Sequence, residues 1–195
     1  MTLPKTGAEP FHNGAFLLKR TLLDFWRWSA SDLVGNALRG ILAEYIVATA
    51  LDLPQAGRVE WEAFDLVTSG GLTLEVKSAA YVQAWEQKAH SRIMFGIAPT
   101  RAFETATNDH TGPLRRQADV YVFCLLHHQD RATLNPLDMA QWTFYVLPTA
   151  TLERLCPKQK SIGLVSLRRM KPRHCAYEEL AQTIHAIGET YDHHH

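Results

Sequence analysis

Residues 65–83 read Asp65-Leu-Val-Thr-Ser-Gly-Gly-Leu-Thr-Leu-Glu75-Val-Lys77-Ser-Ala-Ala-Tyr-Val-Gln83. Every second residue from Leu72 to Val76 is apolar, which predicts a strand whose other face carries Glu75 and Lys77. Residues 63–68 predict the preceding strand, and the glycines of the connection relieve the steric cost of positive φ in a tight turn. The stretch therefore predicts a β-hairpin that carries two carboxylates and a lysine.

The length of the connection sets which residues of the hairpin face each other. A three-residue loop pairs Thr68 with Leu72 and places Asp65 opposite Glu75 on the same face, with Cβ atoms about 5 Å apart. Two like charges in this position destabilise a sheet unless a cation lies between them or one carboxylate is protonated. Carboxylate oxygens suit Mg²⁺, with Mn²⁺ as the alternative. We therefore expect Asp65 and Glu75 to bind a divalent metal ion.

The chemistry of such a site is phosphodiester hydrolysis, in which a metal ion activates water and neutralises charge on the phosphate. Magnesium keeps several waters and few protein ligands, so the main-chain carbonyl of Val76 is expected to complete the inner shell. Lys77 would lie beside the water. Its ammonium would orient the nucleophile, stabilise the pentacoordinate phosphate or take part in proton transfer, and the sequence leaves these roles open.

The order of Asp65, a glycine-containing turn and Glu75-x-Lys77 resembles the active site of the PD-(D/E)xK, or restriction-endonuclease-like, nuclease superfamily. Phe64 stands where the superfamily often has proline. The resemblance covers mainly residues 31–85, with weaker agreement to about residue 148. It implies an α/β fold with a restriction-endonuclease-like mixed central sheet flanked by helices, built on an αβββαβ-type core.

A helix is expected over residues 31–51, with Ser31 or Asp32 as its cap. An apolar arc on one side of this helix consists of Val34, Ala37, Leu38, Ile41, Tyr45 and Ala48. Glu44 lies at the margin of that arc. The resemblance makes Glu44 a third carboxylate near the metal, and the alternative is a boundary residue paired with Arg39 or solvent.

Gln83 follows Lys77 by six positions, which is similar to the Glu-x-Lys-(five residues)-Gln pattern of several families in the superfamily. The resemblance implies a supporting catalytic role for Gln83. Its amide would hydrogen-bond the attacking water or a phosphate oxygen. The alternative is an ordinary surface glutamine.

Composition indicates one domain over residues 1–195, because the hydrophobic fraction of 46% supplies one core. We expect a core over about 31–148 and a C-terminal extension of strand and helix over 149–190. His193-His-His195 resembles a purification tag. No run approaches the about 18 apolar residues of a membrane span, so a cytoplasmic protein without a membrane partner is expected. Three widely spaced cysteines suit neither disulfides nor zinc, and we expect buried thiols.

The remaining elements are expected to form the scaffold around the hairpin. Predicted strands cover residues 91–98, 118–126, 142–147 and 161–167, and predicted helices cover 149–155, capped by Thr149, and 176–187. The near-continuous apolar run at 118–126 indicates a central strand buried on both faces. The polar stretch 99–117 is expected to be a mobile loop that closes over substrate.

The formal net charge is zero, so any basic surface for nucleic acid must be local. The densest basic cluster consists of Arg168, Arg169, Lys171 and Arg173. Arg115-Arg116 and the pair Lys158 and Lys160 form smaller groups. These clusters are expected to contact phosphates, with a solvated surface as the alternative.

The sequence thus predicts a Mg²⁺-dependent endonuclease that hydrolyses DNA phosphodiester bonds. The alternative is a catalytically inactive nucleic-acid-binding or scaffold module of the same fold. DNA is the expected partner, and RNA stays open. Specificity would come from a homodimer, from a helicase, methylase or specificity partner, or from the loops. The sequence does not distinguish among restriction, repair, junction resolution and defence as the biological role of such a nuclease.

Overall fold

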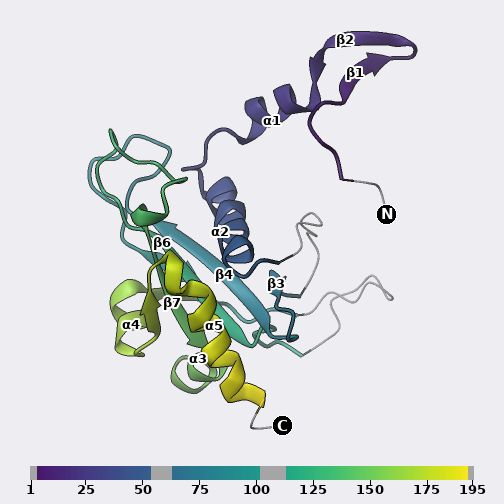
Figure 1. The fold of residues 1–195 in the computed structure, drawn as a ribbon. Coiled ribbons are helices and arrows are strands. Elements are labelled where there is room, and N and C mark those ends of the chain that lie inside the picture. The colour runs from purple at the N-terminus through teal and green to yellow at the C-terminus, as the bar shows by residue number, and fades with distance from the viewer. Residues whose placement is uncertain (1–3, 54–62, 102–112, 193–195) are drawn as a thin grey trace.

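The hairpin predicted from sequence is present in the computed structural model, which describes residues 4–53, 63–101 and 113–192 (Figure 1). Strand β3 (Leu66–Val67) runs antiparallel to β4 (Thr73–Ala80), with Val67 opposite Thr73. The N–H of Thr68 donates to the carbonyl of Leu72 at 2.9 Å, which confirms the predicted register. Gly71 has a φ of +84°, a conformation that favours glycine.

A five-stranded mixed sheet forms the centre of the fold, in the order β3-β4-β6-β7-β9. Its further strands are β6 (Val120–Leu126), β7 (Trp142–Pro148) and β9 (Arg173–Cys175). Strands β4 and β6 are parallel, and the other neighbours are antiparallel. Every residue of β6 is buried, so the prediction of a central strand is confirmed.

Apolar side chains cover both faces of the sheet. On one face α2 (Asn36–Ala50) and α5 (Tyr177–Asp192) pack over a cluster that includes Leu74 and Val76. On the other face, α3 (Thr149–Leu155), β5 (Met94–Gly96), β8 (Ser161–Gly163) and α4 (Leu164–Arg169) pack over Phe123 and its neighbours. A short 3₁₀ helix, Met139–Gln141, precedes β7. The mixed α/β class is therefore confirmed.

The apolar arc predicted for the helix over residues 31–51, which is α2 in the structure, was wrong. The face of α2 that packs on the sheet contains Ala43, Ile46 and Val47, whereas Ile41 and Tyr45 are 41% and 56% exposed. Both sides of this helix are apolar at helical spacing, so periodicity could not choose between them. Small Ala43, with no exposed surface, is part of the side that lies against the sheet.

The predicted helix start was also wrong. The helix begins at Asn36 after Gly35, and the carboxylate of Asp32 instead accepts the N–H groups of Val34 and Gly35 in a turn. Ser31 is the last flanking residue of the preceding helix, α1 (Leu22–Ala30).

Three further expectations changed in the scaffold. The strand expected at 91–98 is short and pairs with β8 outside the central sheet. The strand expected at 161–167 ends at Gly163 and continues as α4. Thr149 is the first residue of α3, and its hydroxyl donates to the carbonyl of Ala118 at 2.6 Å.

The order of elements differs from an αβββαβ core in one place. Between β4 and β6, the described residues contain β5 and no helix. Most of the loop expected at 99–117, and residues 193–195, lie outside the described residues. The closing helix α5 is confirmed, and the three cysteines are free and buried as expected.

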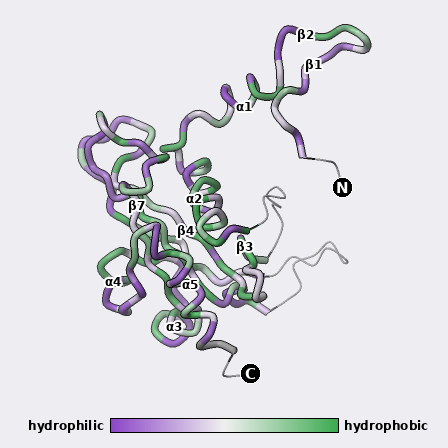
Figure 2. Tube along the Cα trace, viewed as in Figure 1, coloured by the Kyte–Doolittle hydropathy of each residue, from purple (hydrophilic) through white to green (hydrophobic). Residues whose placement is uncertain are grey.

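An N-terminal arm that the sequence pattern did not indicate stands away from the sheet (Figure 1). The arm consists of β1 (Pro10–Asn13), β2 (Phe16–Thr21) and α1. Figure 2 shows hydrophobic stretches in this arm as well as in α2. No residue of α1 is buried, and Trp28 is 82% exposed. Within the described ranges, every helix is too short or too polar to span a bilayer.

Candidate active site

Glu75 and Lys77 point to the same side of β4, as their spacing predicted. The ammonium nitrogen of Lys77 lies 2.5 Å from Oε1 of Glu75, and the two side chains are 31% and 19% exposed for Lys77 and Glu75 respectively. Burial raises the pKa of Glu75, the charge of Lys77 opposes that shift, and Asp65 and Glu44 add to it. Glu75 is therefore a partly buried carboxylate within reach of two other acids.

Asp65 lies in a bend at the start of β3, so the expected strand over 63–68 is shorter than predicted. The N–H of Asp65 donates to the carbonyl of Leu74 at 3.0 Å. Its Oδ2 accepts the main-chain N–H of Val76 at 2.7 Å. Because β3 has two residues, β4 has no strand neighbour on this side beyond Leu74 among the described residues. The carboxylate of Asp65 therefore occupies the place where a longer β3 would have continued the ladder.

Glu44 lies on the opposite face of the sheet from Glu75 and Lys77. It lies on α2, whose buried side packs with Leu74 and Val76, whereas Glu75 is on the alternate face of β4. Its negative charge nevertheless contributes to the raised pKa of Glu75. The hydrogen bonds of Arg39 in the described structure go to the neutral oxygens of Val34, Gln83 and Asn36.

The donor atoms of this edge fit a hard divalent cation by type, because they are carboxylate oxygens. Asp65 and Glu75 supply them, and the carbonyl of Val76 belongs to the same strand segment, whereas Glu44 contributes only its charge from a distance. Among the described residues, no three His, Cys, Asp or Glu side chains form a cluster that could hold a metal ion. In this arrangement the Lys77 ammonium provides the positive charge next to Glu75.

Gln83 is buried rather than at the surface, so the alternative of an ordinary surface glutamine was wrong. It is 6% exposed, its Nε2 donates to the carbonyl of Ala80 at 2.8 Å, and its Oε1 accepts from Arg39 Nη1 at 3.4 Å. The structure thus brings Gln83 together with Arg39, a residue to which the sequence pattern had given no functional role. An arginine at helical spacing from Ala43 and Ile46 was the signal available for it.

The geometry above can be compared with known proteins. The sequence model of the family described as bacteriophage T4 endonuclease IV matches residues 20–162. The chain belongs to the bacteriophage T4 endonuclease IV family. Membership in this family implies endodeoxyribonuclease activity, which is the hydrolysis of phosphodiester bonds. No curated protein sequence matches the chain.

The endonuclease IV match includes the whole edge of β4 described above. The candidate residues inside it are Glu44, Asp65, Glu75, Val76, Lys77 and Gln83. Tyr121 also falls within the match and was missed from sequence. It is the neighbour of Glu75 on β6, and its pKa is raised by burial and further by the charge of Glu75. Its position in an apolar strand gave no separate signal.

The basic cluster lies outside the endonuclease IV match and away from the carboxylates. Arg168, Arg169, Lys171 and Arg173 are exposed, at the end of α4 and the start of β9. Lys77, Phe123, Tyr145 and His174 are successive cross-strand neighbours on β4, β6, β7 and β9. The distance from Lys77 to His174 across these four strands is about 14 Å, because neighbouring strands lie about 4.8 Å apart. Arg168 donates to the hydroxyl of Tyr145 at 2.7 Å. The cluster is therefore separate from the candidate site.

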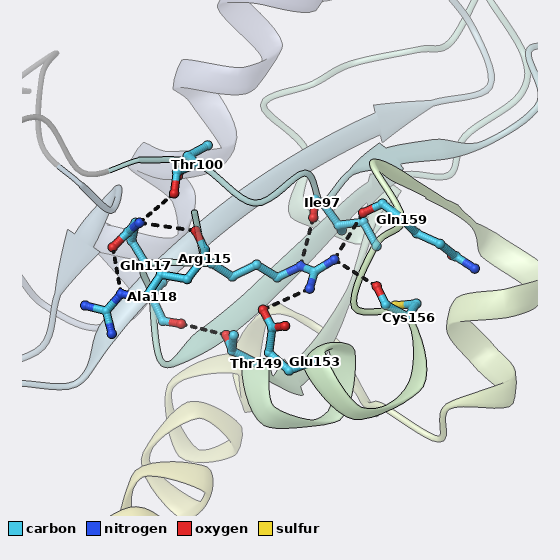
Figure 3. A network of polar contacts seen from close by, with 10 residues as sticks. Ile97, Thr100, Arg115, Gln117, Ala118, Thr149, Glu153, Cys156 and Gln159 are labelled. Atoms are coloured by element: carbon cyan, nitrogen blue, oxygen red, sulfur yellow. Dashed lines mark hydrogen bonds and ion pairs between the residues drawn. The ribbon is translucent and has the colours of Figure 1, made fainter. Parts of the chain in front are cut away.

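Arg116 has a structural role instead of the expected phosphate contact. Figure 3 shows the polar network around it. The guanidinium is 4% exposed and donates to Glu153 Oε1 at 2.9 Å and to the carbonyls of Ile97, Cys156 and Gln159. These contacts fasten α3 to the segment before β6. Because its donors are used inside the protein, Arg116 does not belong to a phosphate-binding surface.

Proposed function

We propose that this member of the endonuclease IV family cleaves DNA in a Mg²⁺-dependent reaction at a PD-(D/E)xK-type site on β4. The observation that carries the proposal is the contact of Glu75 with Lys77 at the edge where Asp65 binds the Val76 N–H. The proposal includes the restriction-endonuclease-like core as the fold of the sheet. It rests on the pattern and spacing of these residues together with family membership.

Asp65 and Glu75 would hold Mg²⁺, or Mn²⁺, with the Val76 carbonyl. Glu44 would join them as a further carboxylate only after moving closer, because the three acids do not form a cluster among the described residues. When bound, the ion lowers the pKa of water and neutralises charge on the phosphate. The Val76 N–H holds one oxygen of Asp65 in a fixed direction, so that carboxylate is oriented before any ligand arrives. Glu75 is partly buried, which strengthens its attraction for a cation.

Lys77 would act on the reacting groups. Water attacks phosphorus, the bond from phosphorus to the leaving oxygen breaks, and the leaving oxygen gains a proton. An ammonium beside the phosphate stabilises the added negative charge of the pentacoordinate state and orients the water. The same ammonium contacts Glu75, so a cation bound to Glu75 would compete with that contact and leave Lys77 for the phosphate.

Cleavage of supercoiled plasmid and of labelled single-stranded, duplex and branched DNA tests this function. We expect cleavage with Mg²⁺ or Mn²⁺, and we expect EDTA and Glu75→Ala to abolish it. An exposed acid away from the site, Glu178→Ala, is the matched control and should cleave normally. Intact DNA in every reaction with the unmodified chain, or cleavage that survives Glu75→Ala, would refute the proposal.

A further inference from the structure

A pocket of about 360 Å³ lies at the carboxyl end of β4, just beyond the residues proposed for catalysis. Its polar and aromatic lining includes Asn36, Arg39, Ser78, Gln83, Trp85 and Arg92. The distance along β4 from Lys77 to Ala80 is about 10 Å, because a strand rises about 3.3 Å per residue. The pocket is therefore adjacent to the site but distinct from it.

Arg39 gives the pocket a buried positive charge, and none of its hydrogen-bond partners among residues 4–53, 63–101 and 113–192 is an acid. The residue is 4% exposed, and its Nη atoms donate to Val34 O, Gln83 Oε1 and Asn36 Oδ1. All three acceptors are neutral, and the Nε atom is buried without a hydrogen-bond partner in the described structure. Burial lowers the pKa of Arg39. A buried cation of this kind is costly unless a negative charge compensates it, and guanidinium groups suit phosphate oxygens.

Trp85 supplies an exposed aromatic surface in the same pocket. It is 56% exposed, although an indole is one of the largest apolar side chains. Arg131 Nη2 donates to the carbonyls of Gln83 at 2.7 Å and Trp85 at 2.8 Å, which holds this turn in place. A turn held in place that presents an exposed aromatic side chain in the same pocket as a cation suits a nucleotide, with the base stacked on the ring and the phosphate on the charge.

We propose that this pocket binds a nucleotide of the substrate strand next to the cleaved phosphodiester. Its phosphate contacts the guanidinium of Arg39, with Arg92 at the rim, and its base stacks on Trp85. Gln83 keeps Arg39 oriented and thereby acts as a positioning residue instead of contacting the attacking water. The inference rests on the proposed function for the identity of the ligand, but nucleotide binding itself can be measured without cleavage.

The test is to measure binding of deoxythymidine 5′-monophosphate to the full chain in EDTA, with tryptophan fluorescence and calorimetry as the two readouts. We expect quenching of fluorescence in the unmodified protein and in Trp28→Ala, an exposed tryptophan of the arm, but not in Trp85→Ala. Loss of the stacked base should weaken binding by about fivefold to a hundredfold. Thymidine and inorganic phosphate, each carrying half of the ligand, should bind more weakly than the nucleotide.

Arg39→Met should weaken binding of the nucleotide by about tenfold or more while leaving thymidine unchanged, because only the phosphate contact is lost. Arg39→Lys should restore part of that binding. If Arg39→Met does not fold by circular dichroism, the exposed substitutions Trp85→Ala and Arg92→Gln decide the question. Equal affinity of Trp85→Ala and the unmodified protein for the nucleotide would refute the proposal that this pocket binds a nucleotide.

The two proposals fail in different ways. Nucleotide binding that depends on Trp85, together with DNA left intact in Mg²⁺, would refute the proposed nuclease mechanism and support the proposed nucleotide site. Suppose that Trp85→Ala cleaves DNA with the same KM as the unmodified protein and that no nucleotide binds in EDTA. This outcome would refute the nucleotide site and support the nuclease mechanism. If both hold, Trp85→Ala should raise KM and leave kcat nearly unchanged.

Discussion

The carboxylate of Asp65 accepts the main-chain N–H of Val76 at 2.7 Å, beyond the last residue of β4 that pairs with β3. Val76 is 6% exposed, so without this acceptor its N–H would be left largely out of water. Asp65 therefore has a structural role in the metal-free protein besides its proposed role as a metal ligand.

This dual role separates two substitutions of Asp65. Asp65→Ala should destabilise the metal-free protein by about 1–3 kcal/mol, because a buried N–H loses its charged acceptor. Asp65→Asn keeps an acceptor oxygen and should cost less. Both should abolish cleavage. Urea unfolding in EDTA measures the difference, and equal stability of Asp65→Ala and Asp65→Asn would contradict the structural role.

Glu75→Gln should stabilise the metal-free protein at neutral pH, because it removes a carboxylate that burial and two acids disfavour as a charge. The pKa of Glu75 is raised in the folded state. The stabilisation gained by protonating Glu75 is therefore fully present below its unfolded pKa and is lost as pH rises through the raised folded pKa. The Tm difference between Glu75→Gln and the unmodified protein should shrink as the pH is lowered. A constant difference across that range would argue against this origin.

Lys77→Met should reduce kcat by about 100-fold or more, because the charge that stabilises the phosphate is lost. Metal affinity should remain nearly the same, since Lys77 is not a ligand. Mg²⁺ titration of cleavage rates separates kcat from metal affinity. Cleavage at the unmodified rate would end this assignment.

Reversal of charge at Arg168 and Lys171 should weaken DNA binding and reduce the steepness of its salt dependence, because fewer counterions are released. Lys88 and Arg154 are exposed, lie outside all three basic groups and provide a matched double reversal. Binding is measured in EDTA over a range of salt concentrations. If both double variants bind alike, the cluster has no special role.

The sequence predicted the hairpin well because its register depends on local chemistry. Gly71 and the spacing of Glu75 and Lys77 determine which residues face one another, and both lie within a few residues of the site. The face of α2 could not be predicted in the same way. Ile41 and Ala43 are both apolar, and only the contact with a distant sheet decides which one is buried.

The pocket residues were missed for a related reason. Arg39 and Trp85 are 46 positions apart in the chain, and only the fold brings them together. The length of β3 was likewise unpredictable from alternation alone, since the bend at Asp65 depends on a bond to Val76.

The short β3 also affects how this protein behaves toward other copies of itself. An unpaired strand edge is a template on which another chain can add a strand, and proteins protect such edges with charged side chains. At the edge of β4, the Val76 N–H already donates a hydrogen bond to Asp65, and Glu75 and Lys77 are charged residues on the same stretch of the strand. We therefore expect the residues proposed for catalysis also to disfavour strand addition at this edge, and neutral replacements at all three positions should increase aggregation as well as remove the activity.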